Sequence, residues 1–178
     1  GEASRTEARR LLSSVEDAFR NRVELATWLD GPTRTEALAK LAKVSNGVGF
    51  PDTFHSYAPA GVGAFSYLEN RNRLSRDAYR LNSLKLTQPV ERSHWYMSAI
   101  EVNAYFAPTQ NQVVFPAGIL QWPFFQVSAS PASNFGGIGT VMGHELTHGF
   151  DDVGRQYDGL GSLRDWWMPA VKDSFGAR

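Results

Sequence analysis

Residues 144–148 read His-Glu-Leu-Thr-His, and this motif constrains the chain more than any other feature. On a helix, positions i and i+4 share a face, so His144 and His148 can direct their imidazoles toward one metal ion. Glu145 lies about 100° round the helix from His144, within reach of a water on that metal without being a ligand. Zinc lowers the pKa of its water from about 15.7 toward about 7, and a neighbouring carboxylate can accept the proton. The motif therefore predicts zinc-dependent cleavage of peptide bonds.

The sequence around the motif favours a largely buried helix, one face of which carries the candidate metal-binding histidines. The five residues alone also occur by chance in unrelated proteins, as an ordinary helix surface. Here residues 134–139 read Asn-Phe-Gly-Gly-Ile-Gly, which predicts a turn-rich approach that lets the chain come close to other backbone. Val141, Met142 and Leu146 are apolar and predict packing into a core. We therefore expect a helix over about residues 136–150 that carries the metal site.

The third metal ligand is not evident in the sequence. A catalytic zinc generally keeps three protein ligands and one open position. One peptidase class uses a histidine ten residues after the first, but Gly154 occupies that position, so this class is excluded. His55 and His94 lie upstream and are expected at the surface or the edge of the core. A later glutamate is the other common ligand, yet none follows Glu145. The ligand is either a later aspartate or a residue beyond Arg178, and we favour the second. The later aspartates are Asp151, Asp152, Asp158, Asp165 and Asp173.

Two carboxylates follow the second histidine within one helical turn, and two interpretations stay open for them. Asp151 and Asp152 can orient the ligating imidazoles by accepting hydrogen bonds from their other ring N–H groups. They can equally end the helix or bind a nearby cation such as Arg155.

Further motifs occur in a fixed order along the second half. They are Val-Asn-Ala-Tyr at 102–105, Asn-Gln-Val-Val-Phe-Pro-Ala-Gly-Ile-Leu-Gln at 111–121, Gly-Gly-Ile-Gly at 136–139 and His-Glu-Leu-Thr-His-Gly-Phe-Asp-Asp at 144–152, followed by Gly-Arg at 154–155 and Trp-Trp at 166–167. In order and spacing they strongly resemble the neprilysin and endothelin-converting-enzyme family of zinc metallopeptidases. The resemblance is dense over about residues 89–168, and looser over 28–30, 33–44 and 49–52, which look like the family's preceding helical segment.

The resemblance implies a role for each matching position. His144 and His148 would be ligands of one zinc ion, and Glu145 the general base of an endopeptidase acting on oligopeptides. Asn103 and Ala104 would lie on an edge strand that holds the peptide extended. A third group would wall an apolar pocket for the substrate side chain just after the scissile bond, so that cleavage falls on the amino side of bulky apolar residues. These residues are Ile119, Phe124, Phe125 and Val141. Plain core packing is the alternative for the two phenylalanines.

The sequence also departs from the family pattern. Members of the family take the third zinc ligand from a downstream Glu-x-x-x-Asp motif, and use a later histidine and arginine to stabilise the transition state and anchor the substrate. None of these is in the sequence, nor is the family's helical lid or membrane anchor. We therefore expect an internal fragment of a longer protein, inefficient as an isolated enzyme. The resemblance implies a parent enzyme at the extracellular face of the plasma membrane, or secreted.

Composition excludes several other functions. Eighteen basic residues balance eighteen acidic ones, so there is no electrostatic footprint for nucleic acid or an anionic membrane. No apolar run approaches the roughly 18–20 residues that span a bilayer. The sequence has no cysteine, which gives no sign of a disulfide framework.

Hydrophobic periodicity predicts a mainly α-helical chain with one short β-hairpin, an α+β fold. Helices are expected over about 4–30, from a Thr33–Glu36 capping box to Gly47, and from Ser75 onward. Two strand-like runs at 102–106 and 112–115 predict the hairpin. We expect a helical segment over 1–88 and, over 89–178, the first part of a zincin catalytic core of the thermolysin type, incomplete in this chain.

A competing hypothesis from another class is a truncated or diverged form that binds peptides without cutting them. The intact histidine–glutamate–histidine set argues against divergence, because a binding-only protein does not need Glu145. A closed structural zinc site is weaker still, since two histidines without cysteines make a poor tetrahedral cage.

Overall fold

The computed structural model describes residues 1–54 and 56–177, which form two compact units. The first unit comprises Gly1–Pro51 and Arg92–Arg178, and the second comprises Asp52–Glu91. The expectation for His55 and the predicted ligand beyond Arg178 lie outside the described residues. The domain division at residues 88 and 89 stays a prediction.

A three-stranded sheet lies at the centre of the first unit. Its strands are β1 (Ser45–Gly49), β2 (Tyr105–Ala107) and β3 (Gln112–Pro116), in the order β1-β3-β2. The predicted hairpin is confirmed, because β2 pairs antiparallel with β3, although β2 begins only at Tyr105. Strand β1 was not predicted; it pairs parallel with β3 and contains Gly47, which was expected to end a helix. A Cβ atom at Gly47 would lie 3.0 Å from the Val114 side chain, so the strand needs its glycine for close packing.

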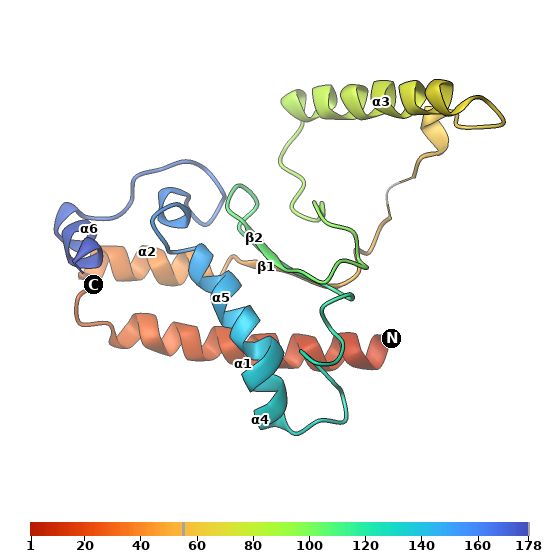
Figure 1. The fold of residues 1–178 in the computed structure, drawn as a ribbon. Helices are drawn as coiled ribbons and strands as arrows, with labels where there is room; N and C mark the ends of the chain where they lie inside the picture. The colour runs from red at the N-terminus through yellow and green to blue at the C-terminus, as the bar shows by residue number, and fades with distance from the viewer. Residues whose placement is uncertain (55, 178) are drawn as a thin grey trace. The chain divides into compact units, whose positions relative to one another are not determined.

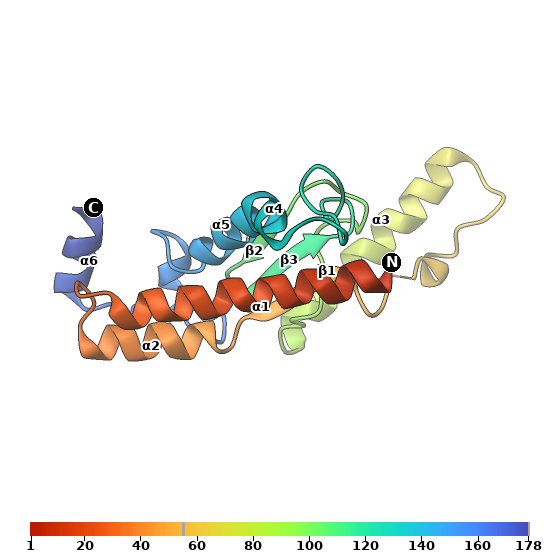
Figure 2. The same cartoon turned by 90° about the horizontal axis from the view of Figure 1, so that it is seen from below.

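Two helices, α1 (Glu2–Leu25) and α2 (Gly31–Leu41), lie side by side in both views of the molecule (Figure 1, Figure 2). The expected Thr33–Glu36 capping box is wrong. The cap is Asp30, whose carboxylate accepts a hydrogen bond of 2.8 Å from the Thr33 backbone N–H. Pro32 fits in the first turn of α2, because an N–H at that position has no partner within the helix. The first helix therefore ends earlier than predicted, and α2 starts earlier.

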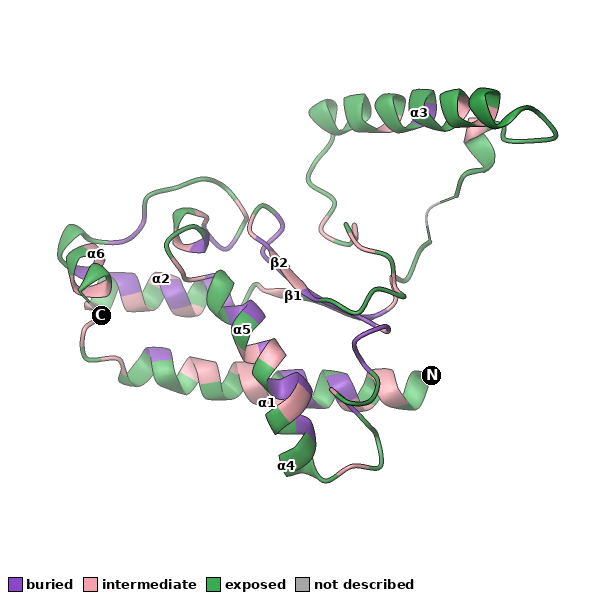
Figure 3. Cartoon of the chain, in the orientation of Figure 1, coloured by how far each residue is buried: buried purple, intermediate pink, exposed green. Residues whose placement is uncertain are grey.

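The second unit contains α3 (Tyr67–Leu84), flanked by the short 3-10 turns η1 (Ala58–Ala60) and η2 (Lys85–Thr87). Its expected start at Ser75 is wrong. Ser66 caps the helix by accepting a hydrogen bond from the Glu69 N–H at 3.2 Å, which satisfies one of the free donors of the first turn. Most residues of α3 are exposed (Figure 3).

The helix with the histidines is preceded by two turns that continue into it. These are α4 (Pro131–Asn134) and the π-helical turn η3 (Phe135–Gly139), followed by α5 (Thr140–His148). The glycines of η3 allow a close approach: a Cβ at Gly137 would lie 2.3 Å from the carbonyl oxygen of Phe124. Because Gly137 has no Cβ, the backbone can come close enough for the Ile138 N–H to donate a hydrogen bond of 2.8 Å to the Phe124 carbonyl.

One face of α5 is buried and the other is open. Met142 and Leu146 are fully buried in a cluster with Leu11 of α1 and Phe115 of β3. Buried and exposed stretches alternate along α5 in Figure 3, as expected for an amphipathic helix. The core therefore fixes the rotation of α5, and with it the direction of the residues on its open face.

The chain after α5 forms a turn with the 3-10 helix η4 (Gly154–Gln156) and then α6 (Pro169–Gly176). Trp166 and Trp167 pack with Val171 in a second buried cluster, where they act as core residues. The molecule is thus mainly helical with a small sheet, as the sequence predicts. Within the described part of the chain, no helix combines the length and the hydropathy required to cross a bilayer.

We predict that Leu11→Ala lowers the free energy of unfolding by about 2–5 kcal/mol, because it leaves a cavity under the helix that carries the histidines. Leu25→Ala on the same helix is the matched control. Its side chain is 78% exposed, so the expected change is within about 0.5 kcal/mol. Urea denaturation checks both values, and equal losses for the two variants would contradict the packing described.

Candidate metal and catalytic site

The two histidines of the motif converge on the open face of α5. The Nε2 atoms of His144 and His148 lie 3.0 Å apart, and their rings are nearly perpendicular with centroids 4.6 Å apart. Both side chains are exposed. Two nitrogens bound to one zinc ion at about 2.0–2.1 Å would lie about 3.3 Å apart at a tetrahedral angle, close to the spacing found here. The pair therefore fits two ligands of a single metal ion.

Glu145 lies near both histidines and strand β2. Its side chain is only 7% exposed, and burial raises the pKa of its carboxyl above the ordinary value. The histidines and a backbone hydrogen bond from Phe106 of β2 act in the opposite direction. A carboxylate with a raised pKa accepts a proton more readily at neutral pH, which is the property a general base needs.

Asp151 holds His148 in one orientation. Its Oδ2 atom lies 2.8 Å from Nδ1 of His148, while Oδ1 accepts hydrogen bonds from the N–H groups of Val153 at 3.0 Å and Gly154 at 2.7 Å. Burial acts to raise the pKa of Asp151, but these hydrogen bonds outweigh it and hold the pKa below its usual value. An ionised Asp151 places the proton of the His148 ring on Nδ1, which leaves Nε2 as the metal-binding atom.

Asp152 and Arg155, the other residues weighed at this turn, point elsewhere. Asp152 is exposed, and its backbone carbonyl accepts a hydrogen bond from the Gln156 side chain at 3.0 Å. The Arg155 guanidinium stacks over the rings of Trp167 and Phe175, at 5.3 and 5.4 Å from their centroids. Of the two aspartates, Asp151 is thus the one in contact with an imidazole.

A cavity of about 450 Å³ joins the motif to strand β2. Its lining includes Glu145, His148 and Asp151 together with Ala104 and the residues of β2 that follow it. Asn103 is exposed, and its side-chain oxygen accepts a hydrogen bond from the Ala104 N–H at 2.9 Å. Because β2 is at the edge of the sheet, an extended peptide could pair with it beside the motif.

The four residues expected to wall an apolar pocket lie in the core around this site. Ile119 and Phe125 are buried, whereas Phe124 and Val141 are half-buried. All four belong to the cluster that supports α5, and the cavity beside Glu145 is lined by other residues.

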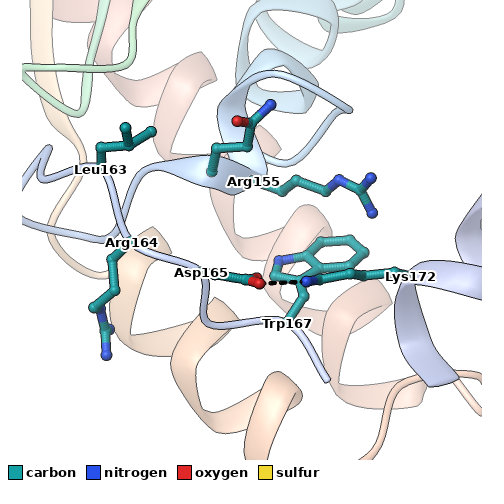
Figure 4. Close-up of a pocket in the computed structure, with 7 residues that line it drawn as sticks. Arg155, Leu163, Arg164, Asp165, Trp167 and Lys172 are labelled. Carbon is teal, nitrogen blue, oxygen red and sulfur yellow. Dashed lines mark hydrogen bonds and ion pairs between the residues drawn. The ribbon is translucent and has the colours of Figure 1, made fainter. Parts of the chain in front are cut away.

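A second cavity, of about 340 Å³, lies beside α6 and is chemically different. Figure 4 shows its basic lining residues Arg155, Arg164 and Lys172, the last of which pairs with Asp165. It contains no histidine and no glutamate. The residues for peptidase chemistry therefore gather only at the first of these two cavities.

Two contributors to the site were not expected from the sequence. Phe106 supplies the N–H that bonds the Glu145 carboxylate. Lys40 of α2 reaches the backbone at the end of α5. The signal for Lys40 was its position: it shares a buried helix face with Thr33, Ala37 and Leu41, where a cation needs a specific partner.

The described residues offer two candidate metal ligands, His144 and His148. Within residues 1–54 and 56–177, no group of three histidine, cysteine, aspartate or glutamate side chains is placed to hold a metal ion. The donor set fits zinc in chemistry, as two imidazoles with an orienting carboxylate, and leaves further positions to other ligands.

Comparison with known proteins identifies the family of this chain. Residues 103–178 match the model of peptidase family M13. Neprilysin-3 of Drosophila melanogaster is 40% identical over 171 residues, which are 92% of this chain and 22% of the relative. Human endothelin-converting enzyme 1 is 38% identical over 184 residues, 98% of this chain and 24% of the relative. The chain thus spans about a quarter of the length of the curated relatives it matches.

Solved structures give the same result. PEPO of Lactobacillus rhamnosis superposes with a TM-score of 0.93 at 34% identity, over 99% of this chain and 28% of that one. Zinc metalloprotease ZMP1 of Mycobacterium tuberculosis, solved with an inhibitor, gives a TM-score of 0.88 at 38% identity, over 98% and 26%. The fold is that of the zincin metallopeptidases. The chain belongs to the neprilysin and endothelin-converting-enzyme family, peptidase family M13.

We predict that Gly154→Ala destabilises the protein by at least about 1–3 kcal/mol, because a Cβ at this position would lie 1.8 Å from the His148 carbonyl oxygen. Gly143→Ala is the matched control. No atom lies within 4 Å of its added Cβ, so removing a helix glycine should stabilise α5 by about 0.5–1 kcal/mol. Thermal unfolding compares the two, and a tolerated Gly154→Ala would contradict the close approach.

Proposed function

We propose that these residues form part of the active site of a zinc metalloendopeptidase that hydrolyses oligopeptides on the amino side of bulky apolar residues. The observation that carries this proposal is the convergence of His144 and His148 beside the buried Glu145, with Asp151 orienting one imidazole. Membership of family M13 supports peptide substrates and zinc.

His144 and His148 would hold the metal through their Nε2 atoms. When bound, zinc acidifies a water ligand and polarises the scissile carbonyl. Asp151 keeps the proton of His148 on Nδ1 and raises the basicity of the ligating nitrogen. The turn that carries Asp151 thereby prepares α5 for the metal.

Glu145 takes the proton from the attacking water and passes it to the leaving amine. Burial raises the pKa of its carboxyl, which suits it to accept a proton at neutral pH and release it in the next step. The Phe106 N–H holds the carboxylate against β2, next to the place where an extended substrate would lie.

The substrate is expected to add a strand at the outer edge of the sheet, beside β2. Its backbone would pair near Asn103 and Ala104, and Ala104 lines the cavity that also contains Glu145. The apolar group of Ile119, Phe124, Phe125 and Val141 would receive the side chain that follows the scissile bond. Phe124 and Val141 are the members of this group with partly exposed surfaces. An extracellular or secreted location is proposed from the family resemblance alone.

A second candidate function is peptide binding without cleavage. The observation in its favour is that, among the described residues, no three histidine, cysteine, aspartate or glutamate side chains are grouped to hold a metal ion. The buried Glu145 separates the two functions, because only catalysis requires a base at that position.

We predict that Glu145→Gln in the complete natural polypeptide lowers kcat by at least about 10²–10⁴-fold, since the amide cannot accept the proton. Zinc content, measured by mass spectrometry, should stay at the wild-type value because Glu145 is not a ligand. Glu24→Gln, at an exposed position of α1, is the control and should keep full activity. Normal turnover by Glu145→Gln on a quenched peptide would refute the mechanism.

His144→Phe should lose both the metal and the activity, because one imidazole cannot hold zinc at this site. His94→Phe is the control, since His94 packs edge-to-face against Tyr96 and is not among the residues that line the cavity beside Glu145. Dialysis against a weak chelator, followed by metal analysis, compares the two variants. Retention of zinc by His144→Phe would exclude the proposed ligand pair.

A further inference from the structure

Lys40 places a buried ammonium group at the C-terminal end of α5. The residue is 1% exposed, and its Nζ donates hydrogen bonds to the backbone carbonyls of Gly149 at 2.6 Å, Gly154 at 2.7 Å and Tyr157 at 2.7 Å. An ammonium has three donors, so all three are used by carbonyl oxygens.

These three carbonyls belong to one structural feature, the end of α5 and the turn that follows it. Gly149 is the C-cap of α5 and comes directly after His148. Carbonyl groups at a helix C-terminus lack partners within the helix and form the negative end of its dipole, so a cation there is stabilising. The Gly154 carbonyl belongs to the residue whose N–H bonds Asp151. Lys40 therefore connects the helix end to the turn that carries Asp151.

Aromatic rings enclose the ammonium. Nζ lies 5.4 Å from the ring centroid of Phe150, 5.8 Å from that of Phe106 and 6.0 Å from that of Trp166. Burial lowers the pKa of Lys40 to about 8, against the opposing effect of the carboxylates of Asp158 and Asp151. The group is therefore mainly charged at neutral pH.

A buried cation is an expensive way to fill space in a core. Desolvation of an ammonium costs several kcal/mol, and apolar residues of similar volume often stabilise a protein as well or better. A methionine would fill the same space between the rings. What it could not do is hold three carbonyl oxygens at one point.

We propose that Lys40 is a positioning residue of the metal site, which fixes the Asp151 turn against the end of α5 and so orients His148 for zinc. The path consists of contacts in sequence: Lys40 to the Gly154 carbonyl, the Gly154 N–H to Asp151, and Asp151 to Nδ1 of His148. This inference rests on the zinc-binding role proposed above.

The test is the zinc affinity of folded protein, because a merely structural role would lower the melting temperature and leave that affinity unchanged. Lys40→Met is made in the complete natural polypeptide, and Lys43→Met, at an exposed position three residues on, is the control. Competition with a fluorescent chelator should show zinc binding about 10–100-fold weaker for Lys40→Met, as for loss of other groups that orient metal ligands. Lys43→Met should match the wild type. Wild-type affinity in Lys40→Met would overturn the inference while leaving the proposed function intact.

A double-mutant cycle with Asp151→Asn tests the path. If Lys40 acts through Asp151, adding Lys40→Met to Asp151→Asn should weaken zinc binding by less than about twofold, because the connection is already broken. If Lys40→Met weakens zinc binding as much in the Asp151→Asn background as in the wild type, Lys40 does not act through Asp151. If the wild type itself binds no zinc, the proposed function and this inference both fail.

A measurement on the wild type covers the case in which Lys40→Met does not fold. Coupling between two sites is reciprocal, so Lys40 should be acetylated faster in the zinc-free protein than in the zinc-loaded protein. The probe is a small acetylating reagent that reacts with amines. Lys43 should react at the same rate in both states. Mass spectrometry of the labelled peptides gives the rates, and an unchanged rate at Lys40 would overturn the inference.

Discussion

The packing of one face of α5 against the core is the interaction on which the site depends. Met142 and Leu146 are buried against Leu11 and Phe115, so the helix cannot rotate without exposing them. The opposite face then presents His144 and His148 with their Nε2 atoms 3.0 Å apart. Two ligands separated by one helical turn need no long-range alignment of their own, because the helix supplies it. The core thus contributes to the chemistry by fixing the rotation of α5 about its axis.

The turn after α5 adds what a helix alone cannot. Gly154 approaches the His148 carbonyl too closely for any side chain, and its N–H meets Asp151. That approach brings the Asp151 carboxylate to Nδ1 of His148. The helix fixes the position of the imidazole and the turn fixes its protonation, while Lys40 bonds backbone carbonyls of both. Glu145 is held separately, by burial and by β2, which keeps the base apart from the ligands.

Much of this site could be predicted from the sequence because its signals are local. The spacing of the histidines and the two strand-like runs of the hairpin each depend on neighbouring residues. The failures concerned competition between signals or contacts over long distances. Thr33 was predicted as the cap of α2, whereas Asp30, three residues earlier, caps it. Strand β1 was not predicted, because a glycine after an amphipathic run usually ends a helix. Here Gly47 lies in the strand and packs closely against the Val114 side chain. Lys40 meets Gly149, 109 residues further along the chain, and no local pattern encodes such a pairing.

The most direct test of the account is X-ray absorption at the zinc edge of the complete natural polypeptide. We predict a nitrogen and oxygen shell that includes two imidazoles at about 2.0–2.1 Å, with the multiple-scattering signature of histidine rings. A shell with one imidazole or none, or with sulfur at about 2.3 Å, would contradict the assignment of His144 and His148 as the metal-binding pair.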